Sequence, residues 1–415
     1  MQHITISLPW QAWITDGSHD ILVPAGWHVD RLLSNDPAAM APQEIARALD
    51  EPIDALSLSE IAAGRNSACI VIDDLARPTQ PAQYLPQLVS RLQAGGMPEE
   101  NIRIVIATGT HGPLSSEQIA LKCGPTLAKS LRIESHDAKA PLADTNIPFG
   151  NGSLRINSTL AEAQVKVLTG AVLPHALASF GGGAKAVIPG LVDTDTAARC
   201  HKFGKLNMAR SQTVADNLFR HEIELACRKL GIAFAVCIVP NRQRQIAGLF
   251  AGDFVSAHRR AAEFAATAYR TTIVQTYDCL IVNAYPKDID LIQSEGALVS
   301  LKETGPTPVR PDGVIVLTTA ASRTGQHGLF APGGRNHVPP RQRPALANRE
   351  LWLYAPNLSS AEARRLHWEG YPFFQDRLAL LAALEKRLPQ PAAAAVISCG
   401  PMQVLESAAL ESALA

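Results

Sequence analysis

The sequence alternates short apolar runs rich in β-branched residues with longer stretches of helical periodicity, and this alternation constrains the fold most. Two such runs, SACIVIDD at 67–74 and NIRIVIATGT at 101–110, flank the helical pattern QYLPQLVSRLQAGG at 83–96. Strands separated by helices in this way form βαβ crossovers, in which neighbouring strands run parallel. The sequence therefore predicts an α/β fold with largely parallel sheets flanked by helices.

A second alternation begins after residue 270, with YDCLIVNAYP at 277–286 and GVIVLTTA at 313–320. A chain of 415 residues also exceeds the length at which one hydrophobic core usually stops growing. We therefore predict two α/β domains, residues 1–270 and residues 271–415. The Pro- and Arg-rich residues 331–350 are predicted to form an irregular loop.

Composition excludes several classes of partner. The chain has 38 basic and 38 acidic side chains and no run of Lys or Arg, so nucleic acid is not expected to bind. The seven cysteines are scattered without a CxxC pair, which indicates reduced core thiols and not a zinc site. Because no apolar segment approaches membrane-spanning length and the N-terminus lacks a basic leader, we expect a cytoplasmic protein with no membrane partner.

Polar residues follow the first strand run, where parallel sheets usually collect functional groups. Asp73, Asp74 and Arg77 lie in the segment DDLARPT. Arg77 could bind a carboxylate or a phosphate through two parallel hydrogen bonds. Alternatively, Asp74 caps the following turn and pairs with Arg77 at the surface. The motif alone leaves both interpretations open.

The second run ends in TGTHG, which places His111 in a turn between Gly109 and Gly112. Glycines in such a turn let the backbone approach a ligand closely. An isolated loop histidine is more often structural or solvated than catalytic, so a functional role for His111 requires a partner.

The segment LTGAVLPHALASFGGGAKAVIPG at 168–190 contains His175, three consecutive glycines and Lys185. It matches a dinucleotide fingerprint and a P-loop only weakly. The glycines could admit a phosphate, or they could only permit tight packing with Lys185 in solvent. His201 follows Lys185 by sixteen residues on a predicted helix and could bind a metal through its imidazole.

A fourth group of polar residues, Asp288, Asp290 and Gln293, follows the strand run DCLIVNAYP. The two aspartates could simply cap a helix.

Taken together, DDLARPT, TGTH, LPH followed by GGGAKAVIPG, and the later histidine resemble the nickel-dependent lactate racemase family. The ordered match extends from Asp73 to Gln293. The resemblance implies a two-domain α/β enzyme with its active site in the cleft between the domains. The implied activity is that of an isomerase, a racemase or epimerase that inverts C2 of a 2-hydroxy acid.

The same resemblance implies the cofactor of the family, a nickel-pincer nucleotide (pyridinium-3-thioamide-5-thiocarboxylate mononucleotide). Lys185 matches its covalent attachment site and His201 matches its nickel ligand. Asp74, Gly182 and Gly183 are expected to lie at the cofactor. Cofactor-biosynthesis enzymes of the host are therefore implied as partners, together with a small-molecule 2-hydroxy acid as substrate.

In the family, His111 and His175 match paired acid/base histidines, and Arg77 and Gln293 match residues that contact the substrate. The α-hydrogen of a 2-hydroxy acid is too weakly acidic for a histidine to remove directly. Hydride transfer to the cofactor avoids this problem if a histidine takes the hydroxyl proton. The resulting planar 2-keto acid can then accept hydride on its opposite face.

The chain departs from the family pattern at two positions. Gly296 stands where many members have a lysine, and Ala76 stands where a hydroxyl residue is frequent. Arg77 could then hold the substrate carboxylate alone, or Lys302 or Arg323 could replace the missing cation.

Three alternatives follow for the function. The first is a C2 epimerase of a longer sugar acid or hydroxydicarboxylate, because a glycine leaves room for a larger substrate. The second is a non-catalytic relative that binds the nickel nucleotide, although such a protein has no use for two acid/base histidines. A nicotinamide dehydrogenase is disfavoured because no complete GxGxxG follows an early strand.

Overall fold

The protein is represented by a computed structural model, which describes residues 2–207, 213–301, 307–335, 346, 348–366 and 368–407. Most of the loop predicted at 331–350, namely residues 336–345 and 347, lies outside the described residues, as does Lys302. The chain divides into two compact units. The terminal unit comprises residues 1–36, 266–326 and 330–415, and the central unit comprises residues 37–265 and 327–329. The predicted domain boundary at residue 270 stays a prediction.

A six-stranded sheet forms the centre of the central unit, in the order β13-β12-β9-β4-β5-β6. All neighbouring pairs in it are parallel except β12 and β13. The strands are β13 (Ile246–Gly252), β12 (Phe234–Pro240), β9 (Val165–Ala171), β4 (Ala68–Asp73), β5 (Ile102–Ala107) and β6 (Arg132–Ser135). The helices are α1 (Pro42–Asp50), α2 (Leu58–Ala62), α3 (Leu85–Ala94), α4 (Ser116–Cys123), α5 (Pro125–Ser130), α6 (Ser158–Glu162), α7 (Thr194–Asn207), α8 (Leu218–Lys229) and α9 (Ser256–Ala268), whose last three residues are counted with the terminal unit.

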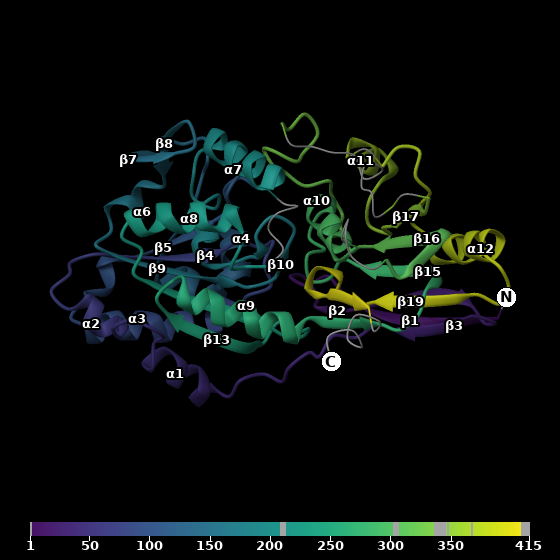
Figure 1. Ribbon diagram of the computed structural model, residues 1–415, viewed down its shortest axis with the longest axis horizontal. Helices are drawn as coiled ribbons and strands as arrows, with labels where there is room; N and C mark the ends of the chain where they lie inside the picture. Colours follow the sequence, from purple (N-terminus) through teal and green to yellow (C-terminus); the bar gives the residue numbers. More distant parts are fainter. Residues whose placement is uncertain are drawn as a thin grey trace. The chain divides into compact units, whose positions relative to one another are not determined.

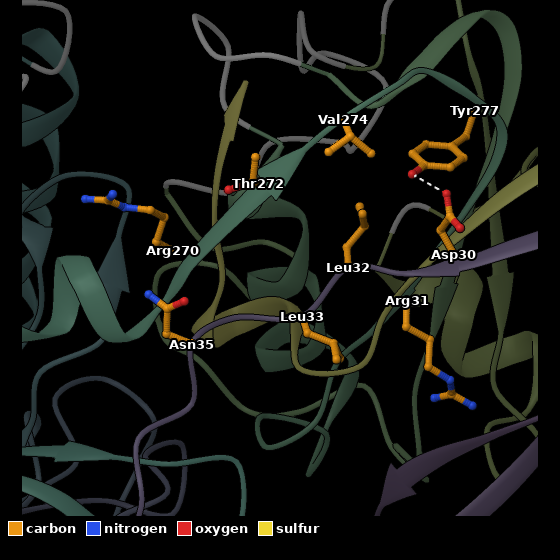
Figure 2. Close-up of a pocket in the computed structure, with 9 residues that line it drawn as sticks. All are labelled: Asp30, Arg31, Leu32, Leu33, Asn35, Arg270, Thr272, Val274 and Tyr277. Carbon is orange, nitrogen blue, oxygen red and sulfur yellow. Dashed lines mark hydrogen bonds between the residues drawn. The ribbon is translucent and has the colours of Figure 1, made fainter. Parts of the chain in front are cut away.

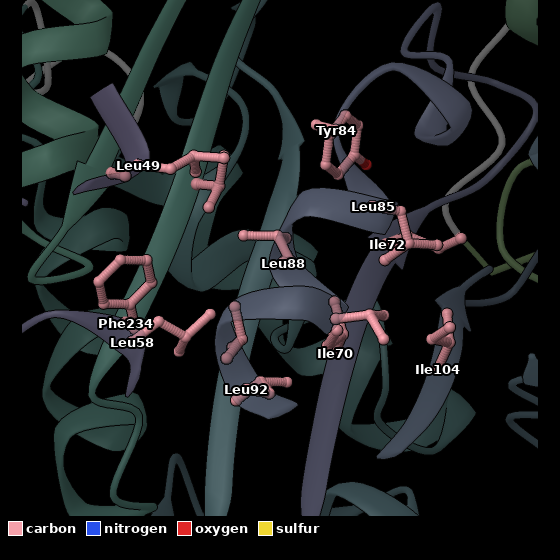
Figure 3. Packing of buried hydrophobic residues seen from close by; sticks show 14 of the residues in the cluster. Leu49, Leu58, Ile70, Ile72, Tyr84, Leu85, Leu88, Leu92, Ile104 and Phe234 are labelled. Atoms are coloured by element: carbon pink, nitrogen blue, oxygen red, sulfur yellow. The ribbon is translucent and has the colours of Figure 1, made fainter. Parts of the chain in front are cut away.

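Helices lie on both faces of this sheet, with α3 and α8 on opposite sides (Figure 1). Leu85, Leu88 and Leu92 recur at helical spacing on α3 and are fully buried. They pack against alternate strand residues such as Ile70 and Ile104 (Figure 3). Two antiparallel hairpins complete the unit, β7 (Ala143–Phe149) with β8 (Gly152–Ile156) and β10 (Pro174–His175) with β11 (Ser179–Phe180).

The terminal unit contains a second six-stranded sheet, which is parallel throughout. Its strands, in spatial order, are β18 (Phe373–Phe374), β17 (Glu350–Tyr354), β16 (Val309–Thr318), β15 (Tyr277–Asn283), β19 (Ala393–Ile397) and β3 (His28–Arg31). Its helices are α10 (Leu291–Ser294), α11 (Ser360–Arg365) and α12 (Arg377–Arg387). Strands β14 (Arg270–Ile273) and β20 (Val404–Ser407) form a separate parallel pair.

Alternate residues of β15 enter two different cores, because side chains alternate between the faces of a strand. Leu280 and Val282 belong to one core, while Cys279 and Ile281 belong to the other. The second core is closed by α12 and by an N-terminal antiparallel hairpin, β1 (His3–Trp10) with β2 (Gly17–Pro24). The predicted α/β fold with parallel sheets flanked by helices is confirmed, and this hairpin covers a face where helices were expected.

Gly252 is required where β13 meets the segment after α1. Its φ is +141°, and a Cβ there would overlap the carbonyl oxygen of Ile53, with which Gly252 forms a parallel bridge. Gly64 also has a positive φ, +69°, but no heavy atom lies within 4 Å of its Cβ position. Substitutions at these two glycines therefore distinguish the cost of a steric clash from the cost of backbone strain alone.

We expect Gly252→Ala to destabilise the central unit by about 3 kcal/mol, and Gly64→Ala by about 1 kcal/mol. All five tryptophans belong to the terminal unit, so their fluorescence does not report unfolding of the central unit. Hydrogen exchange of the β13 amides, followed by mass spectrometry across a urea series, measures the difference. Equal losses in the two variants would contradict the steric argument.

Candidate active site

Three neighbouring parallel strands of the central unit end at the same edge of the sheet. β4 is followed by Asp74 and Arg77, β5 is followed by His111, and β9 leads to His175. Because parallel strands point the same way, the loops after them lie at one edge. The topology thus explains why residues from separate motifs share one side of this unit.

Asp73 anchors the loop after β4. Its Oδ1 accepts hydrogen bonds from Lys122 Nζ at 2.7 Å and from the Thr79 hydroxyl, and its Oδ2 accepts one from the Ala171 N–H at 2.7 Å. Gly170 is needed beside it, since a Cβ there would lie 3.1 Å from Asp73 Oδ2. Asp73 therefore ties β4 to the end of β9 and is a structural carboxylate.

Lys122, on α4, is the cation that completes this anchor, and no motif in the sequence pointed to it. Its side chain is fully buried, and its ammonium also donates to the carbonyl oxygens of Arg77 at 3.1 Å and Thr79 at 2.8 Å. Removing one partner of a buried ion pair leaves an uncompensated charge. Lys122 thus holds the backbone of the loop that carries Asp74 and Arg77.

Asp74 supplies the partner that His111 requires. His111 Nδ1 is hydrogen-bonded to Asp74 Oδ2, and Asp74 Oδ1 accepts the Ala76 N–H at 3.1 Å. Burial alone would raise the pKa of Asp74, but the nearby positive charges of His111 and Arg77 outweigh it and lower the pKa to about 2. Asp74 is therefore ionised and can only accept a hydrogen bond, so His111 carries a proton on Nδ1 and Nε2 is the nitrogen that can act as a base.

Arg77 is half-buried next to this pair. Its Nη1 donates to the carbonyl oxygen of Ala76 at 3.0 Å, and its charge influences the pKa of both Asp74 and Lys185. The turn-capping interpretation of Asp74 is correct in part, since Asp74 accepts the Ala76 N–H, but Asp74 also binds His111.

Glycines join the His111 turn to the Lys185 segment. The Gly109 N–H donates to the carbonyl oxygen of Gly190 at 2.8 Å, and a Cβ at Gly109 would lie 3.3 Å from the Pro189 oxygen. A Cβ at Gly190 would overlap the carbonyl oxygen of Ala186. These close approaches bring two motifs together that lie far apart in the sequence.

Lys185 lies in a short 3-10 turn, Gly183–Ala186, and is half-buried. Burial, reinforced by the positive charge of Arg77, lowers the pKa of its amine to about 7. A substantial fraction of the amine is therefore neutral at physiological pH, and a neutral amine is the form that attacks an acyl group.

His201, on α7, is oriented by its own helix. Its Nδ1 donates to the carbonyl oxygen of Ala197 at 2.8 Å, so the neutral ring has its lone pair on Nε2. Burial, followed by the charge of Lys185, lowers the pKa of His201 to about 4, so the ring is neutral. A neutral imidazole with one bonded Nδ1–H is the usual form of a histidine metal ligand.

Among the described residues, no group of three or more His, Cys, Asp or Glu side chains could hold a metal ion. A metal bound by His201 would therefore need donors other than a cluster of these side chains. A cofactor that brings its own sulfur donors meets this requirement.

His175 has the opposite tautomer to His111. It lies in the hairpin β10–β11, and its Nδ1 accepts the N–H groups of Leu177 at 3.1 Å and Ala178 at 3.3 Å. Because a backbone N–H can only donate, the neutral ring carries its proton on Nε2. His175 is thus a hydrogen-bond donor in this conformation.

Gly182 and Gly183 pack against the protein itself. A Cβ at Gly182, whose φ is +78°, would lie 2.9 Å from Val172 Cγ2, and one at Gly183 would lie 3.1 Å from the ring of His258. These distances explain both glycines by packing. Their predicted contact with the cofactor stays a prediction.

Behind the glycines lies a buried polar network that the sequence analysis did not identify. Arg220 donates to the carbonyl oxygen of Phe180 at 2.5 Å, and His258 Nε2 bonds to that of Gly181 at 2.8 Å. Glu224 joins Arg220 to Arg259, which it binds through both carboxylate oxygens. This network fixes the backbone that leads into Lys185.

Gln293 belongs to the terminal unit, unlike the other predicted site residues. It lies on α10, where its N–H donates to the capping carboxylate of Asp290 at 2.9 Å. Asp290 is thus the helix cap that the sequence allowed. Gly296 follows, and a Cβ there would lie 3.8 Å from Cδ of the buried Lys287.

A surface pocket of about 390 Å³ in the terminal unit contains none of the predicted site residues (Figure 2). Asp30 in its wall is already bonded to the Tyr277 hydroxyl and to Gln275, each at 2.9 Å. We assign it no function.

None of the helices in the described part of the chain has the length and apolar composition to cross a bilayer.

Comparison with known proteins shows similarity to lactate racemases. Residues 15–213 match the lactate racemase N-terminal domain. Lactate racemase of Lactiplantibacillus plantarum is 27% identical over 334 residues, which cover 78% of this chain and 76% of that protein. Lactate racemase of Thermoanaerobacterium thermosaccharolyticum is 29% identical over 292 residues, which cover 68% of this chain and 66% of that protein.

Solved structures agree with the fold. The lactate racemase apoprotein of Thermoanaerobacterium thermosaccharolyticum superposes with a TM-score of 0.75 at 22% identity, covering 97% of this chain and all of that chain. A protein of Thermotoga maritima matches with a TM-score of 0.67 at 14% identity over 90% of this chain and all of that chain. At these identities the structures support the fold alone.

The fold and the motif order thus define an α/β protein of the racemase type. The matched domain and the two curated relatives support the lactate racemase family that the motifs predicted, and they indicate an isomerase.

The pKa of Lys185 can be measured directly. We expect acetic anhydride to acylate Lys185 with a rate that rises to a plateau through a midpoint near pH 7. Because the charge of Arg77 lowers this pKa, Arg77→Gln should move the midpoint to higher pH, yet below the value of about 10.4 for a free lysine, since burial remains. Peptide mapping by mass spectrometry reads out the rate, with the exposed Lys139 as internal control. A wild-type midpoint near 10 would contradict the buried environment.

Proposed function

We propose that the chain is a racemase of a small 2-hydroxy acid, with lactate as the first candidate, and that it uses a nickel-pincer nucleotide. The observation that carries the proposal is the Asp74–His111 pair, in which an ionised carboxylate accepts a hydrogen bond from His111 Nδ1. The family relationship supports the substrate class, because the two curated relatives are lactate racemases.

The residues present suit the cofactor. Lys185 offers an amine with a pKa near 7 for a thioamide link, and His201 offers an Nε2 lone pair for nickel. When bound, the nucleotide supplies an electrophilic ring carbon that can hold hydride from C2 of the substrate. The protein supplies orientation and proton handling.

In this mechanism His111 Nε2 accepts the hydroxyl proton of the substrate, and Asp74 stabilises the imidazolium that forms. His175 Nε2–H donates a hydrogen bond to the substrate oxygen in its second orientation, and the proton held on His111 Nε2 returns to that oxygen, so that no net proton is gained or lost. Arg77 binds the carboxylate while the rest of the molecule turns. Gln293 as a further substrate contact rests on the family resemblance.

A second candidate, a C2 epimerase of a longer acid, is favoured by Gly296. The position where many relatives have a lysine lacks a side chain here, and among the described residues beyond its chain neighbours only Lys287 Cδ lies within 4 Å of its Cβ position. Of the two cations suggested from the sequence, Arg323 is exposed and Lys302 lies outside the described residues.

The cofactor is tested by co-expressing the chain with cofactor-building enzymes and purifying it without oxygen. We expect a nucleotide-sized mass on the Lys185 peptide together with nickel, and both should be lost in Lys185→Ala. Loaded protein is then assayed with each enantiomer of lactate and of longer 2-hydroxy acids. No adduct, while a known family member loads in the same host, would contradict the proposal. An adduct without turnover of any acid would support a nucleotide-binding relative.

The opposite tautomers of the two histidines predict unequal effects of the same substitution. Glutamine can donate a hydrogen bond but cannot accept a proton. We therefore expect His111→Gln to lower kcat/KM by on the order of 10²–10⁴-fold, and His175→Gln by roughly tenfold. Because the two enantiomers have equal free energy, each variant must lose the same factor in kcat/KM whichever enantiomer is the substrate. Equal losses in the two variants, with cofactor loading intact, would refute the assigned roles.

A further inference from the structure

A third histidine, His327, lies beside His111 and has no counterpart in the motifs described above. Residues 327–329 are counted with the central unit although their chain neighbours on both sides belong to the terminal unit. The Gly328 N–H donates to the carbonyl oxygen of Thr110 at 2.7 Å. This short segment is therefore bonded to the residue directly before His111.

The His327 ring is fixed by its Nδ1. That atom accepts the Leu329 N–H at 3.1 Å and lies 3.1 Å from the Thr110 hydroxyl, which must therefore act as donor. A proton on Nδ1 would face the Leu329 N–H, so the ring is held as the neutral tautomer with its proton on Nε2. The residue is 9% exposed. Burial, followed by the positive charge of His111, lowers the pKa of His327 to about 2, in agreement with a neutral ring.

The ring of His327 packs on the ring of His111. The two centroids are 4.6 Å apart, and the planes are inclined at 58°. The hydrogen bond to Asp74 fixes Nδ1 of His111. Rotation of the ring about that bond would still move Nε2 away from the substrate hydroxyl whose proton it accepts. Since the His111 side chain is 23% exposed, contacts on the face of its ring decide where Nε2 points.

We propose that His327 is a positioning residue for His111: its anchored ring holds the plane of the His111 imidazole and so aims Nε2. A neutral ring suits this place, because a cation there would disfavour the imidazolium that His111 becomes. The inference rests on the proposed function for its kinetic consequence, while the packing itself is independent of the substrate.

The test compares three variants of the cofactor-loaded full chain. His327→Ala removes the ring, His327→Phe keeps a ring without the Nδ1 acceptor, and His327→Asn keeps an acceptor without the ring. We expect His327→Ala to lower kcat by on the order of tenfold to a hundredfold with KM within about twofold. His327→Phe should retain more of kcat than His327→Asn.

Two further readouts separate positioning from misfolding and from failure of the proposed function. Nickel and nucleotide on the Lys185 peptide should be unchanged in all three variants, and His28→Ala, with a 70% exposed side chain, serves as the control. In the unloaded protein, the rate at which diethyl pyrocarbonate modifies His111 should change in His327→Ala and less in His327→Phe.

An unchanged kcat and an unchanged His111 modification rate in His327→Ala would overturn the proposal. Better retention of kcat by His327→Asn than by His327→Phe would also overturn it. If wild-type chain racemises no acid but His111 modification still depends on the ring at 327, the positioning inference stands and the proposed function fails.

Discussion

The buried ion pair between Asp73 and Lys122 is the constraint on which the candidate site depends. It fixes the loop after β4 at both ends, because Asp73 also binds the Ala171 N–H and Lys122 also binds the carbonyl oxygens of Arg77 and Thr79. A flexible loop could not hold Asp74 against His111 in one geometry. One aspartate of the DD motif thus anchors the loop, and the next binds His111.

The partner of Nδ1 determines what each imidazole can do. His111 and His201 donate from Nδ1, to a carboxylate and to a helix carbonyl, and so present Nε2 as a lone pair. His175 and His327 accept backbone N–H groups at Nδ1 and so present Nε2–H. Hydrogen bonds alone therefore divide four residues of one type into two that carry a proton on Nδ1 and two that accept at Nδ1.

Much of this could be predicted from the sequence, because the motifs follow strands that the alternation identifies. Asp74 and His111 come directly after β4 and β5, and adjacency of parallel strands brings their loops together. Other contributors could not be predicted. Lys122 resembles any helical lysine until its burial is known, and His327 reaches Thr110 across 217 residues of sequence. The tautomers depend on individual backbone N–H groups, which no pattern of residue types specifies.

The most direct test of this account is the protonation state of His111 in the resting protein. Nitrogen-15 NMR of histidine-labelled chain, with His111 assigned through His111→Gln, distinguishes a proton on Nδ1 from one on Nε2. The account predicts neutral His111 with its proton on Nδ1 near neutral pH, and loss of that preference in Asp74→Ala. A neutral His111 with its proton on Nε2 in the wild-type chain would contradict the central claim, because the atom that must accept the substrate proton would already carry one.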